Sequence, residues 1–185
     1  MRIYTAKGDE GQTDLLGARV GKDDPRIELL GSLDEATSAI GLGRAHARAA
    51  STGERLIAAQ RDLYQIMAEL AFTDALRPDA LRFPEERVAW LEAEIAAVAD
   101  EVTLPPQFVL PGDTVGGAAL DVARAVVRRA ERAAVVLDRG GHVPNPQILR
   151  YLNRLSSLLF ILARAEDAET GDAPRLAKER SRGAP

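Results

Sequence analysis

The sequence predicts an all-α protein, a five-helix bundle that forms one domain. Apolar residues recur at steps of three and four along five stretches, which is the spacing of one helix face. Segments rich in proline and glycine separate these stretches, and no convincing strand pattern stands between them. With 185 residues, 46% of them hydrophobic, the chain can bury one sizeable core. Amphipathic helices joined by short loops bury their apolar faces against one another, so we expect a bundle.

The first and third of the first three helices have recognisable starts. Ser32 to Glu35 reads as a capping box, in which the serine caps the helix and the glutamate reaches back to the backbone. The second helix has apolar residues at alternating steps of three and four, as a bundle helix does. Pro84, Glu85 and Glu86 predict the third start, because proline suits the first turn and acids suit the positive end of the helix dipole. The predicted ranges are about 32–50, 53–74 and 84–100.

The last two helices follow segments that break a helix. Several prolines and Gly112 interrupt the chain before a long fourth helix, which Asp113 or Thr114 can cap. The fifth helix has a broad face of leucines. These helices are predicted over about 114–138 and 146–170. The remaining sequence is small, charged and proline-bearing, so the single domain divides into a loop region (1–31), the bundle (32–170) and a flexible tail (171–185).

Composition excludes several classes of function. Lys and Arg number 24 and Asp and Glu 28, and this net charge of −4 argues against a nucleic-acid protein. The absence of cysteine excludes disulfides, thiolate catalysis and Cys-ligated metals. His46 and His142 do not form a Glu-x-x-His pair, so a di-iron bundle lacks its ligands. No stretch has the apolar length of a signal peptide or membrane span, so we expect a cytoplasmic protein without membrane contact.

Two features favour an anion site. The first is a stripe on the fourth helix, where Arg124, Arg128 and Arg132 recur every four residues and share one face, with Glu131 beside them and Arg129 about 100° away. Guanidinium groups match phosphate oxygens, so several on one face can clamp a polyphosphate. The alternative is a solvated face on which these arginines pair with nearby acids.

The second feature is the opening segment, residues 4–24, which crowds glycines, acids and basic residues together before the first helix. Glycines let backbone amides approach an anion, Thr5 and Thr13 offer hydroxyls, and Lys7 and Lys22 offer positive charge. The segment could equally be a disordered arm. Neither Gly8 to Gly11 nor any other stretch forms a Walker or Rossmann motif.

These two features and two further motifs occur in the order typical of one family. The stretches are the N-terminal YTAKGDEGQT…RVGKDDPRIELLGSLDEATSAIGL, then FVLPGDT, ARAVVRRAER and YLNRLSSLLFILAR. The chain, from about Ile3 to Arg164, thereby resembles the ATP:cob(I)alamin adenosyltransferases of the trimeric, helical-bundle type. Two positions differ from the usual pattern, because Lys7 stands where the family has threonine and Asp113 where it often has glycine.

The resemblance implies an enzyme that moves the 5′-deoxyadenosyl group of ATP to the cobalt of cob(I)alamin, giving adenosylcobalamin and triphosphate. The protein would supply orientation and positive charge, because Co(I) is itself the nucleophile. The resemblance also implies Mg²⁺ on the triphosphate and a homotrimer with sites between subunits. A flavin-dependent reductase and an adenosylcobalamin-dependent enzyme are candidate partners. The alternatives are a non-catalytic corrinoid carrier or chaperone with the same fold, and a structural scaffold whose arginines pair with acids.

The resemblance further implies roles for single residues. Arg128 would make the principal phosphate contact, and Asp34 would brace Arg124 across a subunit boundary. Phe108 would pack near the lower face of the cobalt and help to displace its axial ligand. Trp90 and Tyr64 are better explained as core or interface side chains. The residues expected to bind ATP are Thr5, Ala6, Lys7, Gly8, Thr13, Asp14, Lys22, Arg128, Arg129, Glu131, Arg132 and Asn153.

Overall fold

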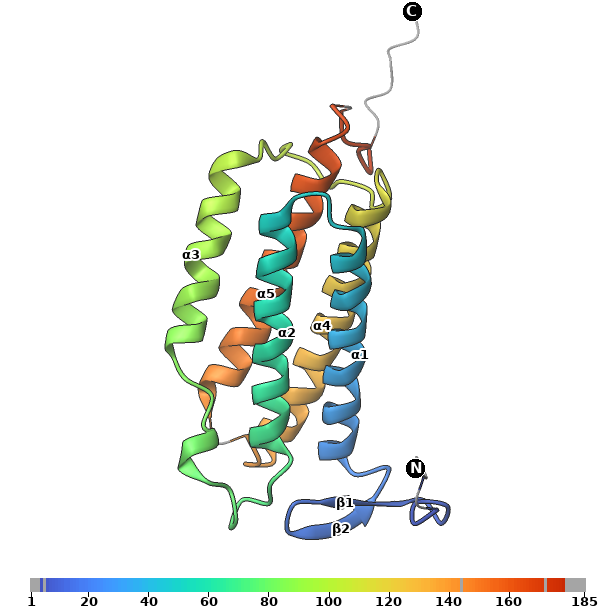
Figure 1. The fold of residues 1–185 in the computed structure, drawn as a ribbon, viewed down its shortest axis with the longest axis vertical. Helices are drawn as coiled ribbons and strands as arrows, with labels where there is room; N and C mark the ends of the chain where they lie inside the picture. The colour runs from blue at the N-terminus through green and yellow to red at the C-terminus, as the bar shows by residue number, and fades with distance from the viewer. Residues whose placement is uncertain (1–3, 5, 144, 172, 179–185) are drawn as a thin grey trace, which may run out of the picture.

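The part of the chain that the structure describes forms five α-helices, which confirms the all-α prediction (Figure 1). The computed structural model describes residue 4 and residues 6–143, 145–171 and 173–178. The helices are α1 (Pro25–His46), α2 (Ala50–Leu70), α3 (Glu86–Glu101), α4 (Val115–Arg139) and α5 (Pro146–Ala168). The smaller elements are strands β1 (Gln12–Leu15) and β2 (Ala18–Gly21) and the short 3₁₀ helix η1 (Asp79–Leu81).

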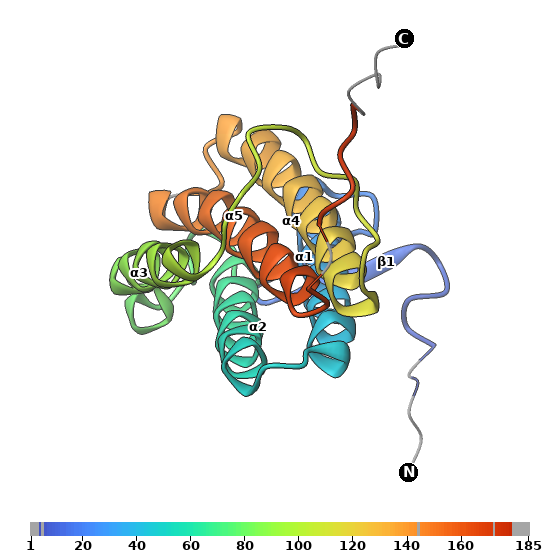
Figure 2. The same cartoon turned by 90° about the horizontal axis from the view of Figure 1, so that it is seen from above.

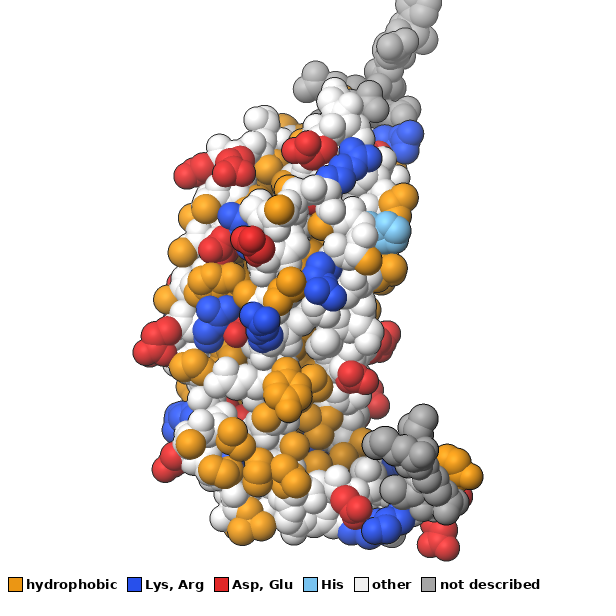
Figure 3. Space-filling view, viewed as in Figure 1, with side chains coloured by type: hydrophobic (Ala, Val, Ile, Leu, Met, Phe, Trp, Pro, Cys, Tyr) orange, Lys and Arg blue, Asp and Glu red, His pale blue; other side chains and the backbone are white. Residues whose placement is uncertain are grey.

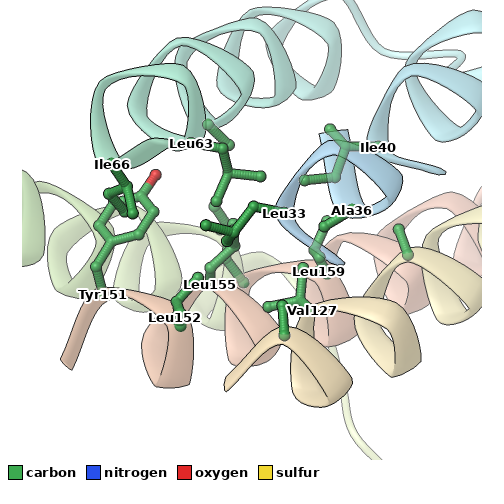
Figure 4. Packing of buried hydrophobic residues seen from close by; sticks show 14 of the residues in the cluster. Leu33, Ala36, Ile40, Leu63, Ile66, Val127, Tyr151, Leu152, Leu155 and Leu159 are labelled. Carbon is green, nitrogen blue, oxygen red and sulfur yellow. The ribbon is translucent and has the colours of Figure 1, made fainter. Parts of the chain in front are cut away.

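The helices pack in a sequence that differs from their order along the chain. α1 packs against both α2 and α4, α4 packs against α5, and α5 carries α3 on its other side. Viewed along the bundle, α3 lies at one edge (Figure 2). Apolar side chains from α1, α2, α4 and α5 meet in the centre, among them Leu33, Leu63, Val127 and Leu155 (Figure 4). Each fully buried leucine stabilises the fold by roughly 2 kcal/mol, so this core holds the four helices together.

The start of α1 differs from the prediction. The helix begins at Pro25, and the Asp24 side chain caps it by accepting a hydrogen bond from the backbone N–H of Arg26 at 2.8 Å. Ser32, the predicted cap, is buried within the helix. The capping-box prediction is therefore wrong, because the Asp-Pro pair offers an earlier start that meets the preferences of both the cap and the first turn. The other predicted helix ends lie within about four residues of the observed ends.

The opening segment contains a β-hairpin, so the expectation of no strand is wrong. Strands β1 and β2 pair antiparallel, with Thr13 opposite Val20. Gly17 has a φ of 112° in the two-residue turn, and a Cβ there would lie 2.6 Å from the hydroxyl oxygen of Thr73. Leu16 exchanges backbone hydrogen bonds with the chain just after α2, donating to Ala71 at 2.9 Å and accepting from Thr73 at 3.0 Å. The hairpin tip is therefore docked onto the end of α2.

A buried polar group joins the edge helix to the bundle. Asp62 of α2 accepts two hydrogen bonds from Arg87 of α3, at 2.8 and 2.7 Å, and one from the Tyr151 hydroxyl of α5 at 2.6 Å. Arg87 also lies over the Trp90 ring, which packs partly buried against the core, as predicted. Tyr64 is 72% exposed, so it is not a core residue.

The C-terminal segment is partly paired with the loop before α4. Leu110 donates its backbone N–H to the carbonyl of Arg175 at 2.8 Å, and Ala177 donates to Phe108 at 2.8 Å. These contacts pair residues 175–177 with the loop, and the flexible tail from residue 171 stays a prediction. In the described part of the chain, no helix is both long and apolar enough to cross a membrane.

The surface carries charges of both signs. On the face formed by α2 and α3, acidic and basic side chains intermingle rather than gather into one positive region (Figure 3). A duplex binder usually presents a continuous basic surface. This face therefore offers no such surface for nucleic acid.

Candidate active site

The arginine stripe lies on the solvent side of α4. Arg128, Arg129 and Arg132 are exposed, while Val127 and Ala130 of the same helix are buried between α1 and α5. The amphipathic pattern of α4 thus fixes the arginines outward, because turning the helix would bring its alanines and valines into water. All three predicted residues are thus exposed on the same helix.

Neighbouring helices contribute polar groups to this surface. Arg129 forms an ion pair with Glu35 of α1. From α5, Asn153 donates a side-chain hydrogen bond to Glu131 at 2.9 Å. Arg132 donates to the backbone carbonyl of Arg128 at 3.0 Å, so the stripe is arranged by its own helix as well. The predicted Glu131 and Asn153 therefore lie side by side although 22 residues separate them.

The opening segment folds back on itself before the hairpin. Ala6 has a φ of 60°, in the left-handed region that non-glycine residues seldom occupy. A Cβ built on Gly8 would lie 3.1 Å from the Lys22 ammonium nitrogen, so these two predicted residues are neighbours. Thr13 and Asp14 lie on β1. The predicted Thr5 lies outside the described residues.

Arg19 organises this segment, and the sequence analysis missed it. Its guanidinium donates hydrogen bonds to the side chains of Gln12 and Asp14, each at 2.9 Å, and to the carbonyl of Lys7 at 2.5 Å. One side chain thus holds the glycine-rich stretch against the hairpin. An alternation of polar residues across the strands could have indicated it, but only once the hairpin was recognised.

The end of the opening segment, where α1 begins, is held by hydrogen bonds and ion pairs to residues just after α2. The buried Arg26 donates to the carbonyl of Phe72 at 2.6 Å and to Asp74 at 3.1 Å, and Asp74 also accepts from Arg77 at 2.7 Å. Partial burial raises the pKa of Asp74, but hydrogen bonds from His142, Arg77 and Arg26 outweigh it and hold this pKa below its usual value. The start of α1 is therefore fastened to the connection that also carries the hairpin.

The hairpin and the stripe helix meet at one end of the bundle. A cavity of about 310 Å³ lies between them, lined by Leu15 and Val20 of the hairpin and by Leu137 near the end of α4. Leu137 follows Arg132 by five residues, which is about 7.5 Å along a helix. The hairpin therefore lies beside the C-terminal end of the helix that carries the stripe.

The loop before α4 forms a second region. Phe108 is 87% exposed, and beside it lies a cavity of about 580 Å³ whose lining includes Arg124, Phe160 and Arg164. Within the chain, Arg124 donates to Asp121 at 3.1 Å, while Asp34 lies exposed on α1. The predicted bracing of Arg124 by Asp34 across a subunit boundary stays a prediction.

A row of buried charges links α4 to α5 beneath this loop. Arg164 donates to Asp121 and to Asp167, each at 2.7 Å. Asp167 also accepts from the backbone N–H and the hydroxyl of Thr114, at 3.1 and 2.8 Å, and that hydroxyl caps α4 at Gly117. Sequence reasoning missed this row because its members lie 43 and 53 residues apart.

In the described part of the chain, no group of three or more histidine, aspartate or glutamate side chains is placed to hold a metal ion. The stripe instead offers cationic donors on an open surface. Such a surface suits a polyanionic ligand that brings its own counter-ion.

Comparison with known proteins assigns the family. The cobalamin adenosyltransferase family model matches residues 3–166. The corrinoid adenosyltransferase of Bacillus subtilis is 38% identical over 175 residues, which cover 92% of this chain and 89% of the relative. The corrinoid adenosyltransferase PduO of Salmonella typhimurium is 39% identical over 94% of this chain, which spans 52% of that longer protein. The corrinoid adenosyltransferase of Mycobacterium tuberculosis is 39% identical, over 91% of this chain and 90% of the relative.

Solved structures give the same result. A variant of the PduO-type ATP:corrinoid adenosyltransferase from Lactobacillus reuteri, complexed with cobalamin and ATP, superposes with a TM-score of 0.86. It is 30% identical, with 96% of this chain and 100% of that chain covered. A second variant, complexed with ATP, has a TM-score of 0.80 at 31% identity, with 95% and 100% covered. With the matched region running from the opening segment through α5, the chain belongs to the cobalamin adenosyltransferase family.

Proposed function

We propose that this chain transfers the 5′-deoxyadenosyl group of ATP to the cobalt of cob(I)alamin and releases triphosphate. The observation that carries the proposal is the exposed stripe of Arg128, Arg129 and Arg132 on a chain whose relatives are corrinoid adenosyltransferases. A carrier that only delivered a corrinoid would have little use for these exposed guanidinium groups on one helix. The catalytic function is therefore favoured over the carrier.

The chemistry sets what the protein must do. The electron pair of Co(I) forms a bond to C5′ of ATP, the C5′–O5′ bond breaks, and triphosphate leaves with that bond's electrons. Negative charge grows on the leaving oxygen, so cations already in place there lower the barrier. Arg128 and Arg132 are exposed on α4 and suited to this role, since guanidinium forks bind phosphate oxygens in pairs. The protein needs no nucleophile of its own.

The opening segment is proposed to close around ATP. Lys22 beside Gly8 can contact the triphosphate, and the backbone around Ala6 and Lys7 can contact the nucleotide. Thr5, Thr13 and Asp14 are assigned to the same segment, and Arg129, Glu131 and Asn153 to the facing side. Mg²⁺ would be held mainly by the triphosphate oxygens, where it would offset their charge.

The loop before α4 is proposed to face the corrinoid. An exposed aromatic such as Phe108 suits the flat, apolar face of a macrocycle and can occupy the lower axial position of the cobalt. Reduction to Co(I) requires an electron donor, so a flavin-dependent reductase is a proposed partner. An adenosylcobalamin-dependent enzyme would take the product.

The active form is proposed to be a homotrimer with sites between subunits. Apolar side chains are exposed beside the stripe, with Leu42 of α1 at 52% and Val122 of α4 at 54% exposure. Exposed apolar groups next to charged ones are typical of subunit interfaces. Such an interface would also bring Asp34 of one subunit within reach of Arg124 of another.

The proposal is tested by mixing the protein with ATP, Mg²⁺ and chemically reduced cobalamin and following the visible spectrum of adenosylcobalamin. Arg128→Ala is expected to keep the circular dichroism spectrum and lower kcat by about 100-fold or more, because a preorganised cation at the leaving group is lost. Arg61→Ala, which removes an exposed arginine of α2, is the matched control and should retain activity. Cobalamin binding without turnover would instead support the carrier.

A further inference from the structure

A large cavity lies where α3 and α5 end. Its volume is about 700 Å³, within the usual range for small-molecule sites. Its walls come from residues 101–105 at the end of α3 and just after it, from the last turn of α5 and from residues 173–175 of the C-terminal segment. None of the site residues predicted from the sequence lines it.

This cavity adjoins the one beside Phe108. Leu104, Pro105 and Arg164 line both cavities, so the two share a wall. Arg164 is 4% exposed, and its Nε atom is buried without a hydrogen-bond partner in the described part of the chain. An unpaired buried donor is uncommon and stands here at the boundary between the two cavities.

The C-terminal segment forms one side of the cavity and is attached to the Phe108 loop. Val109 and Leu176 form an antiparallel bridge, which the two backbone hydrogen bonds of this pairing support. The backbone N–H of Arg175 also donates to the Asp113 carboxylate at 3.2 Å. The segment and the loop are therefore one unit, so a group bound in the larger cavity is held next to Phe108.

The lining combines apolar surface with one available cation. Val102, Leu104 and Pro174 offer contacts for a flat base. The Arg175 side chain is 76% exposed and 3.4 Å from Asp113, an ion pair of the kind that contributes little in water. Arg164, by contrast, is already bound to two carboxylates. Arg175 can therefore turn to an incoming phosphate.

We propose that this cavity binds the nucleotide tail of cobalamin, with the base against the apolar wall and the phosphodiester on Arg175. The inference rests on the proposed function, in which the macrocycle of the same substrate lies against Phe108. Cobalamin consists of a macrocycle with a tethered base, ribose and phosphate, and two adjoining cavities match these two parts. The tail would then contribute to affinity, and the cavity would favour corrinoids that carry one.

The test compares cobalamin with cobinamide, which has the macrocycle but lacks the nucleotide tail. Dissociation constants are measured by equilibrium dialysis, and KM and kcat by the spectral assay, for the wild type, Arg175→Gln and the matched control Arg61→Gln. Arg175→Gln should raise the KM and Kd for cobalamin roughly tenfold, because a charge-assisted hydrogen bond is lost. The values for cobinamide, kcat and the control should be unchanged.

A second variant fills the cavity without changing charge. Ala173→Trp should weaken cobalamin binding and leave cobinamide binding at the wild-type value. The proposal is overturned if both variants weaken the two corrinoids equally, since the residues would then act through the loop, or if neither variant changes cobalamin binding. A wild type that binds cobalamin more tightly than cobinamide but turns over neither would contradict the proposed function and leave the tail site standing.

Discussion

At the scale of single residues, Tyr151 has the most unusual surroundings. Its ring is fully buried and meets Phe83 edge to face, with ring centroids 4.9 Å apart. Burial, and then the charge and hydrogen bond of Asp62, raise the pKa of Tyr151 well above its usual value, although Arg87 opposes the shift. The neutral hydroxyl is therefore the form that the fold requires, because only it can donate to the carboxylate.

This environment predicts that Tyr151→Phe lowers the free energy of unfolding by about 1–2 kcal/mol at pH 7, because Asp62 loses one donor. The difference in unfolding free energy between the wild type and this variant should shrink above about pH 10. There the unfolded wild type loses the tyrosine proton and the folded form keeps it, so wild-type stability falls by about 1.4 kcal/mol per pH unit. Urea unfolding between pH 7 and 11 checks this. Tyr64→Phe is the exposed control, and a constant difference across the range would contradict the pKa assignment.

At the scale of elements, the start of α4 is packed against the end of α5 with unusual closeness. Thr114 caps α4 while bound to Asp167, and Gly116 and Gly117 form the first turn beneath these groups. A Cβ on Gly117 would overlap the Asp167 carboxylate, and a Cβ on Gly116 would lie 3.0 Å from the carbonyl of His46. Both positions therefore require glycine because a Cβ atom would not fit there, although glycine weakens a helix.

Gly117→Ala is therefore expected to destabilise the protein by about 2 kcal/mol, even though alanine favours a helix by about 1 kcal/mol over glycine. Gly53→Ala is the matched change, because Gly53 lies in α2 with nothing within 4 Å of an added Cβ. That variant should gain up to about 1 kcal/mol. Thermal unfolding of both variants measures their changes in stability. A stabilised Gly117→Ala variant would contradict the prediction, because the α4–α5 contact would then have moved to make room for the methyl group.

At the scale of the whole molecule, the two sides of the bundle differ. α3 covers one edge of α5 (Figure 2). In contrast, α1 and α4 expose Leu42, Val115 and Val122 to water. Burying such groups between subunits would stabilise an assembly by about 25 cal/mol per Å² of apolar surface. The helices that carry the arginine stripe and Asp34 thus also expose apolar side chains.

Leu42→Glu is accordingly expected to lower the oligomeric state and the adenosyl transfer rate together, while the isolated chain keeps its helix content. Sedimentation velocity and circular dichroism measure these effects. Ala97→Glu, on the outer side of α3, is the control and should leave assembly unchanged. A fully assembled Leu42→Glu protein would place the interface elsewhere.

The sequence was sufficient to predict the five helices, apart from the start of α1. It was insufficient to predict which distant residues form pairs. α4 was predicted closely because Thr114 can cap its start, and α5 because a broad leucine face follows a helix-breaking segment. The hairpin was missed because each strand has four residues, too few for alternation to be visible. The stripe was found because helical spacing places its members. The contacts of Arg19 and Arg164 depend on tertiary structure and leave no local pattern.

The attachment of α3 gives this protein a built-in optical probe. α3 packs mainly on α5, and the chain's single tryptophan, Trp90, lies on it beneath Arg87 and beside the core. Indole emission responds to hydration and to nearby charge, and no second tryptophan contributes to the signal. The intrinsic fluorescence of the unmodified protein therefore reports detachment of this one helix separately from the circular dichroism signal of all five helices.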